Sequence, residues 1–382
     1  MLEEFLDTKP LYYDEIDYIR MPRVYNRIKS HFKLPKIIHI IGTNGKGTTG
    51  RFLATALANI GYNTGHYTSP HIVNFNERIW FNGENVSMDI LEDFHQELLS
   101  ILTEDERDSL SYFEYTTFLA MLFFSHRCDY VVLEAGLGGE HDATATFENI
   151  LTLVTPIDKD HEAFLGSTIE AIALTKLNAI QKSAIIGQQK HNEIYTIAER
   201  LQNTKEITFY RYESILQKDD FVTIDTIAFH EKLVMYLKQN LALAVAALKY
   251  LQIDYKEEDF YSAKLFGRLS KLDENILVDV GHNTLAAKAI LDSLKDKKYN
   301  LVYNSYKDKN YKEILAILKP IITKVELIDV YNARVEESGY IQKALQDLDI
   351  QYNKFEKIDE KESYLVFGSF SVVEAFLKVY RG

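Results

Sequence analysis

The sequence predicts an α/β protein of two domains. Apolar strand-like runs alternate with helix-like stretches along most of the chain, and no internal repeat interrupts the alternation. A length of 382 residues is too great for one ordinary core, at roughly 150 residues per domain. We therefore expect a larger N-terminal domain with a mainly parallel sheet over residues 1–267 and a smaller Rossmann-like α/β domain over residues 268–382.

The composition indicates a globular protein and argues against several other classes. Hydrophobic residues make up 46% and charged residues 26% of the chain, near the globular average. The acidic start and the short longest apolar run, 118–124, give no support for export or membrane insertion. The single cysteine, Cys128, cannot form an internal disulfide, so we expect a cytoplasmic protein. A net charge of −13 argues against binding to nucleic acid, which attracts surplus Lys and Arg.

The first domain is expected to start its sheet with a buried strand at 36–41, followed by a glycine-rich turn and a helix at 49–60. This order is typical of a phosphate site, because the amides and dipole of a helix N-terminus favour anions. Crossover helices between parallel strands fit the segments that follow. The further elements expected here are strands at 129–134 and 150–154 and helices at 88–102 and 115–126.

The alternation restarts near residue 275, after an expected linker at 266–271. A second, Rossmann-like sheet is the economical interpretation. Its expected strands are 276–280, 301–303, 325–330 and 364–367, and its expected helices are 285–294, 311–318, 341–348 and one after residue 367.

The turn after the first expected strand has the composition of a phosphate loop. Glycines let backbone N–H groups converge on one anion, and Lys46 adds a mobile cation. The general P-loop spacing is not met, because Ile40 stands where its first glycine belongs and Gly47 separates Lys46 from Thr48. The alternative is a turn that only caps the helix, with Lys46 in solvent. The expected nucleotide-binding residues of the loop are Thr43, Asn44, Gly45, Lys46, Gly47 and Thr48.

This loop resembles the G-T-N-G-K-G-[ST] signature of the folylpolyglutamate synthase branch of the Mur ligase superfamily. Further similar blocks follow in order along nearly the whole chain, and several ordered motifs are far more specific than any one. They are T-S-P-H at 68–71, E-R-I at 77–79, F-E-x-x-T at 113–117, E-x-G-L-G-G-x-x-D-A-T at 134–144, D-H-x-x-x-L-G-x-T at 160–168, G-R-L at 267–269, D-V-G-H-N at 279–283, K-D at 307–308 and G-S at 368–369.

The resemblance implies a P-loop-type ATPase domain followed by a glutamate-ligase domain, and an enzyme that uses ATP and Mg²⁺. Such a ligase would join L-glutamate to dihydropteroate and to reduced folates. ATP would convert the acid to an acyl phosphate, which the glutamate amine then attacks. Lys46 and Mg²⁺ would neutralise charge on the transferred phosphoryl group. This branch is usually monomeric, so the expected partners are small molecules.

A metal site is expected at Ser69, Glu134 and His161, to which the resemblance assigns metal ligation. Glu134 ends an expected buried strand, where an unpaired carboxylate is costly and a cation is a natural partner. Mg²⁺ prefers oxygen ligands and is usually held by one or two protein carboxylates together with phosphates. The alternatives are a turn serine before Pro70, a strand-end glutamate facing solvent and a histidine paired with Asp160.

Three residues are expected to act on the reacting groups: Lys46, Lys176 and His282. Lys176 aligns with a family lysine that is carbamylated and supports the metal. Its surroundings, T-K-L-N-A-I at 175–180, differ from the family's E-K-A-G-I, and the alternative is an ordinary helix lysine.

Further nucleotide contacts are implied because a family member closes its C-terminal domain over the nucleotide. On that resemblance Arg268 reaches a phosphate, Asp279 the ribose hydroxyls and Asn240 the adenine, while His282 faces the cleft. The alternatives are a linker arginine in a surface ion pair and a strand-end aspartate that caps the helix at Asn283.

The folate end is expected at Asp17 and Tyr18 and at Tyr112 and Phe113, which match by position the two segments that contact dihydropteroate in the family. Aromatic faces stack well on a flat heterocycle. The chain holds 25 tyrosines and 21 phenylalanines, so ordinary packing is the alternative for each. His141 is a further candidate, because G-E-H at 139–141 replaces the family's G-R-L.

Two further departures from the family pattern concern the segment T-P-I-D at 155–158, in place of T-N-I-G, and Thr284, in place of a proline.

One alternative function is a Mur-type ligase acting on another carboxylic acid, such as a UDP-sugar peptide. The nucleotide domain starts too early to leave room for a UDP-binding domain. The other alternative is a P-loop nucleotide-binding protein without ligase activity, which would not need the 279–283 block or a second α/β domain.

Overall fold

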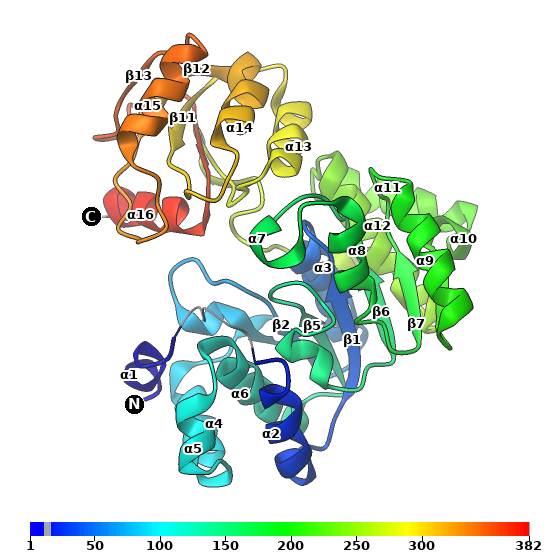
Figure 1. Cartoon of the computed structure of the whole chain (residues 1–382). Helices are drawn as coiled ribbons and strands as arrows, with labels where there is room; N and C mark the ends of the chain where they lie inside the picture. Colours follow the sequence, from blue (N-terminus) through cyan, green and yellow to red (C-terminus); the bar gives the residue numbers. More distant parts are fainter. Residues whose placement is uncertain (11–16, 382) are drawn as a thin grey trace. The chain divides into compact units, whose positions relative to one another are not determined.

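The computed structural model describes residues 1–10 and 17–381, which form two compact units. The first unit comprises Met1–Leu233 and Leu237–Lys264, and the second comprises Val234–Tyr236 and the chain from Leu265 onward (Figure 1). Each unit contains a mainly parallel sheet with helices, so the predicted α/β class is confirmed. None of the described helices is long and apolar enough to span a membrane.

The first unit is built on a sheet that is parallel except at one edge, where β3 and β4 run antiparallel. Its central strands are rich in Ile, Val and Leu, as expected of parallel strands covered on both faces. The order of the described strands is β4 (Glu84–Asn85), β3 (Ile79–Phe81), β2 (Thr64–Tyr67), β5 (Tyr130–Glu134), β1 (Lys36–Ile41), β6 (Leu151–Val154), β7 (Ser183–Ile186) and β8 (Thr208–Arg211).

Helices cover both faces of this sheet, so strand side chains divide between separate cores. On β5, Val131 and Leu133 pack with α6 (Tyr112–Arg127), whereas Val132 packs with α3 (Lys46–Ile60) and α12 (Met235–Tyr250). A third core joins α8 (Ile169–Leu177) and α9 (Glu193–Thr204) to β6 and β7. The other described helices are α1 (Leu2–Asp7), α2 (Arg20–Ile28), α4 (Met88–Ile101), α5 (Glu104–Ser109), α7 (Glu162–Leu165), α10 (Tyr212–Ile215) and α11 (Lys218–His230), with 3₁₀ turns at Lys29–His31, Phe75–Arg78, Ala143–Thr146 and Glu257–Phe260.

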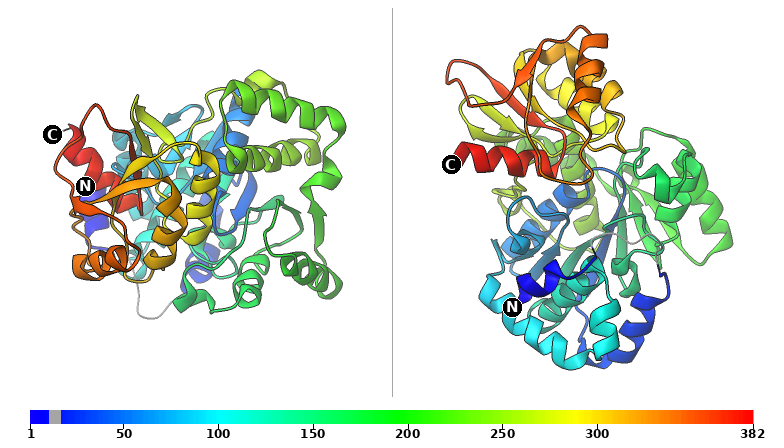
Figure 2. Two further views of the ribbon diagram at one scale, coloured as in Figure 1. Left: turned by 90° about the horizontal axis from the view of Figure 1, so that it is seen from above. Right: turned by 60° about the vertical axis from the view of Figure 1, so that its left-hand side comes forward.

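The second unit has its own sheet and its own core. Its strands are parallel except for β9, which pairs antiparallel with β10. Three helices pack on one face and α16 packs against β14 (Figure 2). The strand order is β13 (Tyr352–Lys354), β12 (Ile322–Leu327), β11 (Tyr299–Tyr303), β14 (Tyr364–Phe367), β10 (Ile276–Val278) and β9 (Ser270–Asp273), and the helices are α13 (Thr284–Leu294), α14 (Tyr311–Leu318), α15 (Ser338–Asp347) and α16 (Phe370–Arg381), with a 3₁₀ turn at Lys319–Ile321.

Helix starts are the main difference from the expected boundaries. The helix expected from residue 115 begins at Tyr112, because Ser111 and Glu114 form a capping box in which each side chain accepts the other's backbone N–H, at 3.1 and 2.8 Å. The helix expected from residue 49 begins at Lys46, directly after the glycine loop. The strand expected at 325–330 begins and ends three residues earlier, at Ile322–Leu327.

Candidate phosphate and metal site

The phosphate loop joins β1 to α3 at the carboxyl edge of the parallel strands. Gly42 has a φ of 143° and Gly45 a φ of 89°, a backbone region that favours glycine. A Cβ atom on Gly42 would lie 2.0 Å from Thr155 Oγ1, and one on Gly45 would lie 2.6 Å from Asn240 Oδ1. The loop therefore has no space for side chains at these positions, and the predicted Asn240 lies directly against it.

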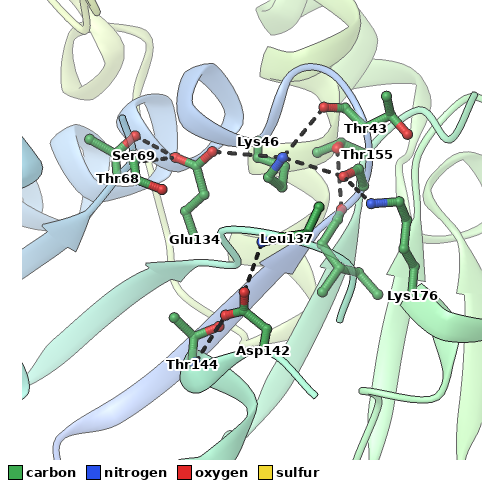
Figure 3. Close-up of polar contacts among 12 residues, drawn as sticks. Thr43, Lys46, Thr68, Ser69, Glu134, Leu137, Asp142, Thr144, Thr155 and Lys176 are labelled. Carbon is green, nitrogen blue, oxygen red and sulfur yellow. Dashed lines mark hydrogen bonds and ion pairs between the residues drawn. The ribbon is translucent and has the colours of Figure 1, made fainter. Parts of the chain in front are cut away.

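Lys46, the first residue of α3, leans back over the loop. Its Nζ atom lies 3.3 Å from Gly42 O, 3.4 Å from Thr43 O and 3.9 Å from Glu134 Oε1. Figure 3 shows this ammonium between the Glu134 carboxylate and the loop carbonyls. A cation held at this place faces any phosphate bound by the loop.

The first turn of α3 also contains two buried hydroxyl groups. Thr48 and Thr49 are buried, and within the described part of the chain their Oγ1 atoms have no hydrogen-bond partner. Buried polar atoms normally have partners, because an unsatisfied one costs free energy. The hydroxyl of the predicted Thr48 thus suits a phosphate oxygen or a hydrated cation.

Glu134 ends β5, and its carboxylate lies beside two residues that follow β2. The Thr68 hydroxyl and the Ser69 backbone N–H both donate to Glu134 Oε2, the latter at 3.4 Å (Figure 3). These contacts arise because β2 pairs with β5 in the sheet. The structure therefore brings the predicted Ser69 and Glu134 together. It adds Thr68, which the sequence interpretation overlooked although it stands in the T-S-P-H block.

The oxygen-rich surroundings of Glu134 fit a hard cation. Mg²⁺ takes oxygen ligands, few of them from protein carboxylates, and shares phosphate oxygens. In the parts of the chain that are described, no group of three or more His, Cys, Asp and Glu side chains could hold a metal ion, so hydroxyl groups would have to contribute. His161 lies just before α7 with a φ of 52°, and its backbone N–H donates to Asp160 Oδ1 at 2.9 Å.

Lys176 reaches the phosphate loop from α8. Its Nζ atom donates to Gly42 O at 2.9 Å, and the residue is 5% exposed. Burial is the main cause that lowers the pKa of this amine to about 7, and the nearby Lys46 charge lowers it further, while Asp160 and Asp142 act in the opposite direction. A substantial fraction of Lys176 is therefore neutral near neutral pH.

A buried hydrogen-bond network holds the loop that follows Glu134. The Asp142 carboxylate accepts from Leu137 N at 2.8 Å, Thr144 N at 3.0 Å and Thr144 Oγ1 at 2.5 Å. His39 Nε2 on β1 lies 2.8 Å from Thr144 Oγ1. Burial raises the pKa of Asp142 despite these bonds. Asp142 thus connects the D-A-T block to the strand before the phosphate loop.

The predicted folate residues form two groups. The rings of Tyr18 and His141 are 4.2 Å apart with an interplanar angle of 37°, and Tyr18 is half-exposed. Asp17 accepts the backbone N–H groups of Ile19 and Arg20 at 3.0 and 3.1 Å, so its carboxylate serves the start of α2. Tyr18 and His141 thus offer an aromatic surface beside the 139–141 segment.

The second group lies at the start of α6. A Cβ atom on Gly136 would come within 2.6 Å of the Phe113 ring, so Phe113 packs on the loop after Glu134. The guanidinium of Arg78 lies 5.2 Å from the Tyr112 ring centre. Phe113 therefore lies against the loop that follows Glu134, and Tyr112 lies against Arg78.

The second unit contains the predicted Arg268, Asp279 and His282. Asp279 is buried and accepts from Gly281 N at 2.7 Å, Leu269 N at 2.8 Å and Tyr236 OH at 3.3 Å. Burial raises the pKa of Asp279, while the Arg268 charge opposes this. The Arg268 guanidinium lies 5.2 Å from the Phe370 ring centre. Through its bond to Leu269 N, Asp279 therefore holds the linker segment that contains Arg268 in place.

His282 lies in the loop before α13. Its Nδ1 atom is 3.2 Å from Val280 O, and the following Asn283 caps the helix by accepting from Ala286 N at 2.9 Å. The alternative role considered for Asp279 was to cap this helix. In the structure Asn283 forms the cap.

Known proteins identify the relatives of this chain, although no protein-family model matches it. The dihydrofolate synthase/folylpolyglutamate synthase of Escherichia coli (strain K12) is 32% identical over 307 residues, covering 75% of this chain and 71% of that protein. Helicobacter pylori folylpolyglutamate synthetase is similar in structure with a TM-score of 0.81 and 38% identity, covering 100% of this chain and 98% of that one. The chain belongs to the dihydrofolate synthase/folylpolyglutamate synthase family. The family predicted from the ordered motifs is therefore confirmed.

The fold of this family member extends to more distant relatives. The bifunctional folylpolyglutamate synthase/dihydrofolate synthase of Yersinia pestis, solved with AMPPNP and a Mn ion, has a TM-score of 0.81 at 24% identity and covers 99% of this chain and 96% of that one. That likeness supports the shared fold of this chain.

Proposed function

We propose that this family member is an ATP-dependent ligase that joins L-glutamate to dihydropteroate and to reduced folates. The observation that carries the proposal is the meeting of Lys46, Glu134 and the Thr68–Ser69 segment at neighbouring strand ends beside the phosphate loop. A carboxylate does not accept an amine directly, because its oxygen is a poor leaving group. A phosphate-binding loop with a cation and an oxygen-rich metal site supplies what activation of that carboxylate needs.

The proposed reaction has two steps. A carboxylate oxygen of the pterin substrate attacks the γ-phosphorus of ATP, and ADP leaves. The glutamate amine then attacks the carbonyl carbon of the acyl phosphate, loses a proton and expels inorganic phosphate. The loop amides and Lys46 would hold the phosphates in line and neutralise charge that develops on them. No protein nucleophile is required.

Glu134, Ser69 and His161 are the proposed ligands of Mg²⁺, with the Thr68 hydroxyl orienting the carboxylate. The bound cation would supply charge neutralisation at the phosphates. We also propose Asn240, Arg268 and Asp279 as nucleotide-binding residues and His282 as a residue that acts on the reacting groups. Asp17, Tyr18, Tyr112, Phe113 and His141 are the proposed pterin-binding residues, and Asp17 also holds the start of α2 beside Tyr18. This assignment follows the family pattern, and the aromatic rings at these places support it.

Lys176 is proposed to be carbamylated. Carbamylation joins the neutral amine to CO₂ with loss of a proton, so it requires an amine that is deprotonated near neutral pH. A pKa of about 7 meets this requirement, and the carbamate anion would lie near the Lys46 charge that lowers this pKa. Carbon-13 NMR after exchange with labelled CO₂ should show a carbamate signal in the wild type and none in Lys176→Met. Full activity without any carbamate signal would refute this part.

The function is tested by ADP release from the purified protein with ATP, Mg²⁺ and glutamate. Three reactions are compared: added dihydropteroate, added tetrahydrofolate and no pterin. We expect turnover with each pterin and only background without one. ADP release that ignores both pterins would rule out the ligase and favour another acid substrate or a simple nucleotide-binding protein.

A further inference from the structure

The phosphate loop rests on the 155–158 segment that follows β6. The N–H groups of Thr43 and Asn44 both donate to Pro156 O, at 2.9 and 3.3 Å. Thr43 Oγ1 donates to Asp158 O at 3.0 Å and accepts from Asp158 N at 3.1 Å. This supporting segment reads T-P-I-D where the family pattern is T-N-I-G. The chain thus has a carboxylate at a position where that pattern has no side chain.

Residues that follow β7 hold this segment in place. The Asp158 carboxylate pairs with Lys190 Nζ at 3.0 Å and with His191 Nε2 at 3.0 Å. The Gln189 side chain accepts from Ile157 N at 2.9 Å and donates to a backbone carbonyl of the same segment at 3.2 Å. Residues 189–191 lie outside every family block.

The Asp158 carboxylate would disturb phosphate binding if it were alone. Asp158 is 6% exposed, and its backbone N–H donates to Thr43 of the loop. Water therefore screens its carboxylate poorly from a phosphate bound by the loop. Burial alone would raise the pKa of Asp158, but bonds from Lys159 N, Lys190 and His191 outweigh it and keep the pKa below its ordinary value. The charge is therefore present and needs compensation.

We propose that Lys190 and His191 are positioning residues for ATP: their side chains pair with the Asp158 carboxylate and keep the 155–158 segment beneath the phosphate loop. This inference deepens the proposed function and rests on it for the identity of the nucleotide. A specific asymmetry follows. Loss of both partner side chains leaves a buried carboxylate without them beside the loop, whereas replacing all three residues together leaves no carboxylate to repel the phosphate.

The test compares the wild type with three variants: Asp158→Asn, the double variant Lys190→Met/His191→Gln, and the triple variant that combines them. The readouts are the Kd for Mg²⁺-AMPPNP by calorimetry and the KM values for ATP and glutamate. We expect the double variant to weaken AMPPNP binding and raise KM for ATP by about fivefold, with kcat and KM for glutamate changed less than about twofold. Asp158→Asn alone should have a smaller effect, and the triple variant should return close to wild-type values.

The matched control is Lys182→Met, which removes another lysine of the same unit that pairs with an acidic residue, Glu148, in an exposed ion pair. It should leave all these constants unchanged. Thermal melts without nucleotide exclude simple unfolding of a variant. Unchanged AMPPNP affinity in the double variant, or a triple variant as weak as the double, would overturn the inference. AMPPNP binding is measured without turnover. Absence of pterin-dependent ADP release would therefore count against the proposed ligase, while the AMPPNP affinities of the variants would still test the roles of Lys190 and His191.

Discussion

Lys46 begins a helix and leans over the carbonyls of its own loop, within 3.9 Å of Glu134. Removing its charge leaves the loop amides and the proposed metal ligands in place but takes away the cation proposed to act on the transferred phosphate. We predict that Lys46→Met lowers kcat by about 100- to 1000-fold while thermal stability stays near that of the wild type. Pterin-dependent ADP release and a thermal melt measure both. Near-normal turnover in Lys46→Met would remove this residue from the mechanism.

Lys176 makes stability depend on pH. Its pKa is about 7 in the folded protein against the ordinary 10.5, so between these values the unfolded chain binds more protons. The free energy of unfolding should therefore rise with pH across that window, relative to Lys176→Met, by up to about 1.4 kcal/mol per pH unit. Below pH 7 the cost of burying the charge should be fully present. Urea unfolding in CO₂-free buffer tests this, and parallel pH profiles of the two proteins would contradict it.

Site residues that belong to a sequence motif could be predicted, whereas residues that join the site only through contacts in the folded chain could not. Lys46, Ser69 and Glu134 stood in recognisable blocks, and the structure places them together. The Thr68 contact with Glu134 depends on β2 lying beside β5. The pairing of Asp158 with Lys190 joins segments 32 residues apart in a region without motifs. Neither contact is readable from one sequence, because each arises only when the sheet is assembled.

At the scale of elements, strongly apolar or periodic segments were predicted well. The strands at 36–41 and 364–367 and the helix at 311–318 have the expected bounds. The sequence did not predict β2, β3, β4, β7, β8, β9 or β13. β2 reads T-G-H-Y and is fully buried, although its glycine and polar residues disfavour a strand on their own. Its burial is supplied by neighbours such as α3 and β5, so tertiary packing overrode local preference.

The loop between β1 and α3 gives a prediction with an internal control. At Gly42, alanine would adopt an unfavourable φ and collide with Thr155, whereas at Gly61, with a φ of 116°, the added Cβ atom meets nothing within 4 Å. Both substitutions should lower the free energy of unfolding, Gly61→Ala by about 1 kcal/mol through backbone strain alone. Only Gly42→Ala should also raise the KM for ATP, by about tenfold or more. Equal effects on that KM would show that loop geometry is not what binds the nucleotide.

At the scale of the whole molecule, each unit has its own sheet and its own hydrophobic core. Such units can unfold separately, so we predict two calorimetric transitions. Mg²⁺-AMPPNP at about 100 times its Kd should stabilise the transition of the first unit by about 2.7 kcal/mol, because the phosphate loop lies there. A single transition in the absence of ligand would contradict the independent cores.

The central claim is that the pterin carboxylate is activated as an acyl phosphate, and isotope transfer tests it most directly. Dihydropteroate labelled with oxygen-18 in its carboxylate is converted with ATP, Mg²⁺ and glutamate, and the inorganic phosphate is analysed by mass spectrometry. The proposed reaction predicts that each phosphate released carries one labelled oxygen from the acid, in step with formation of the glutamyl amide. Unlabelled phosphate accompanying the amide product would contradict the mechanism.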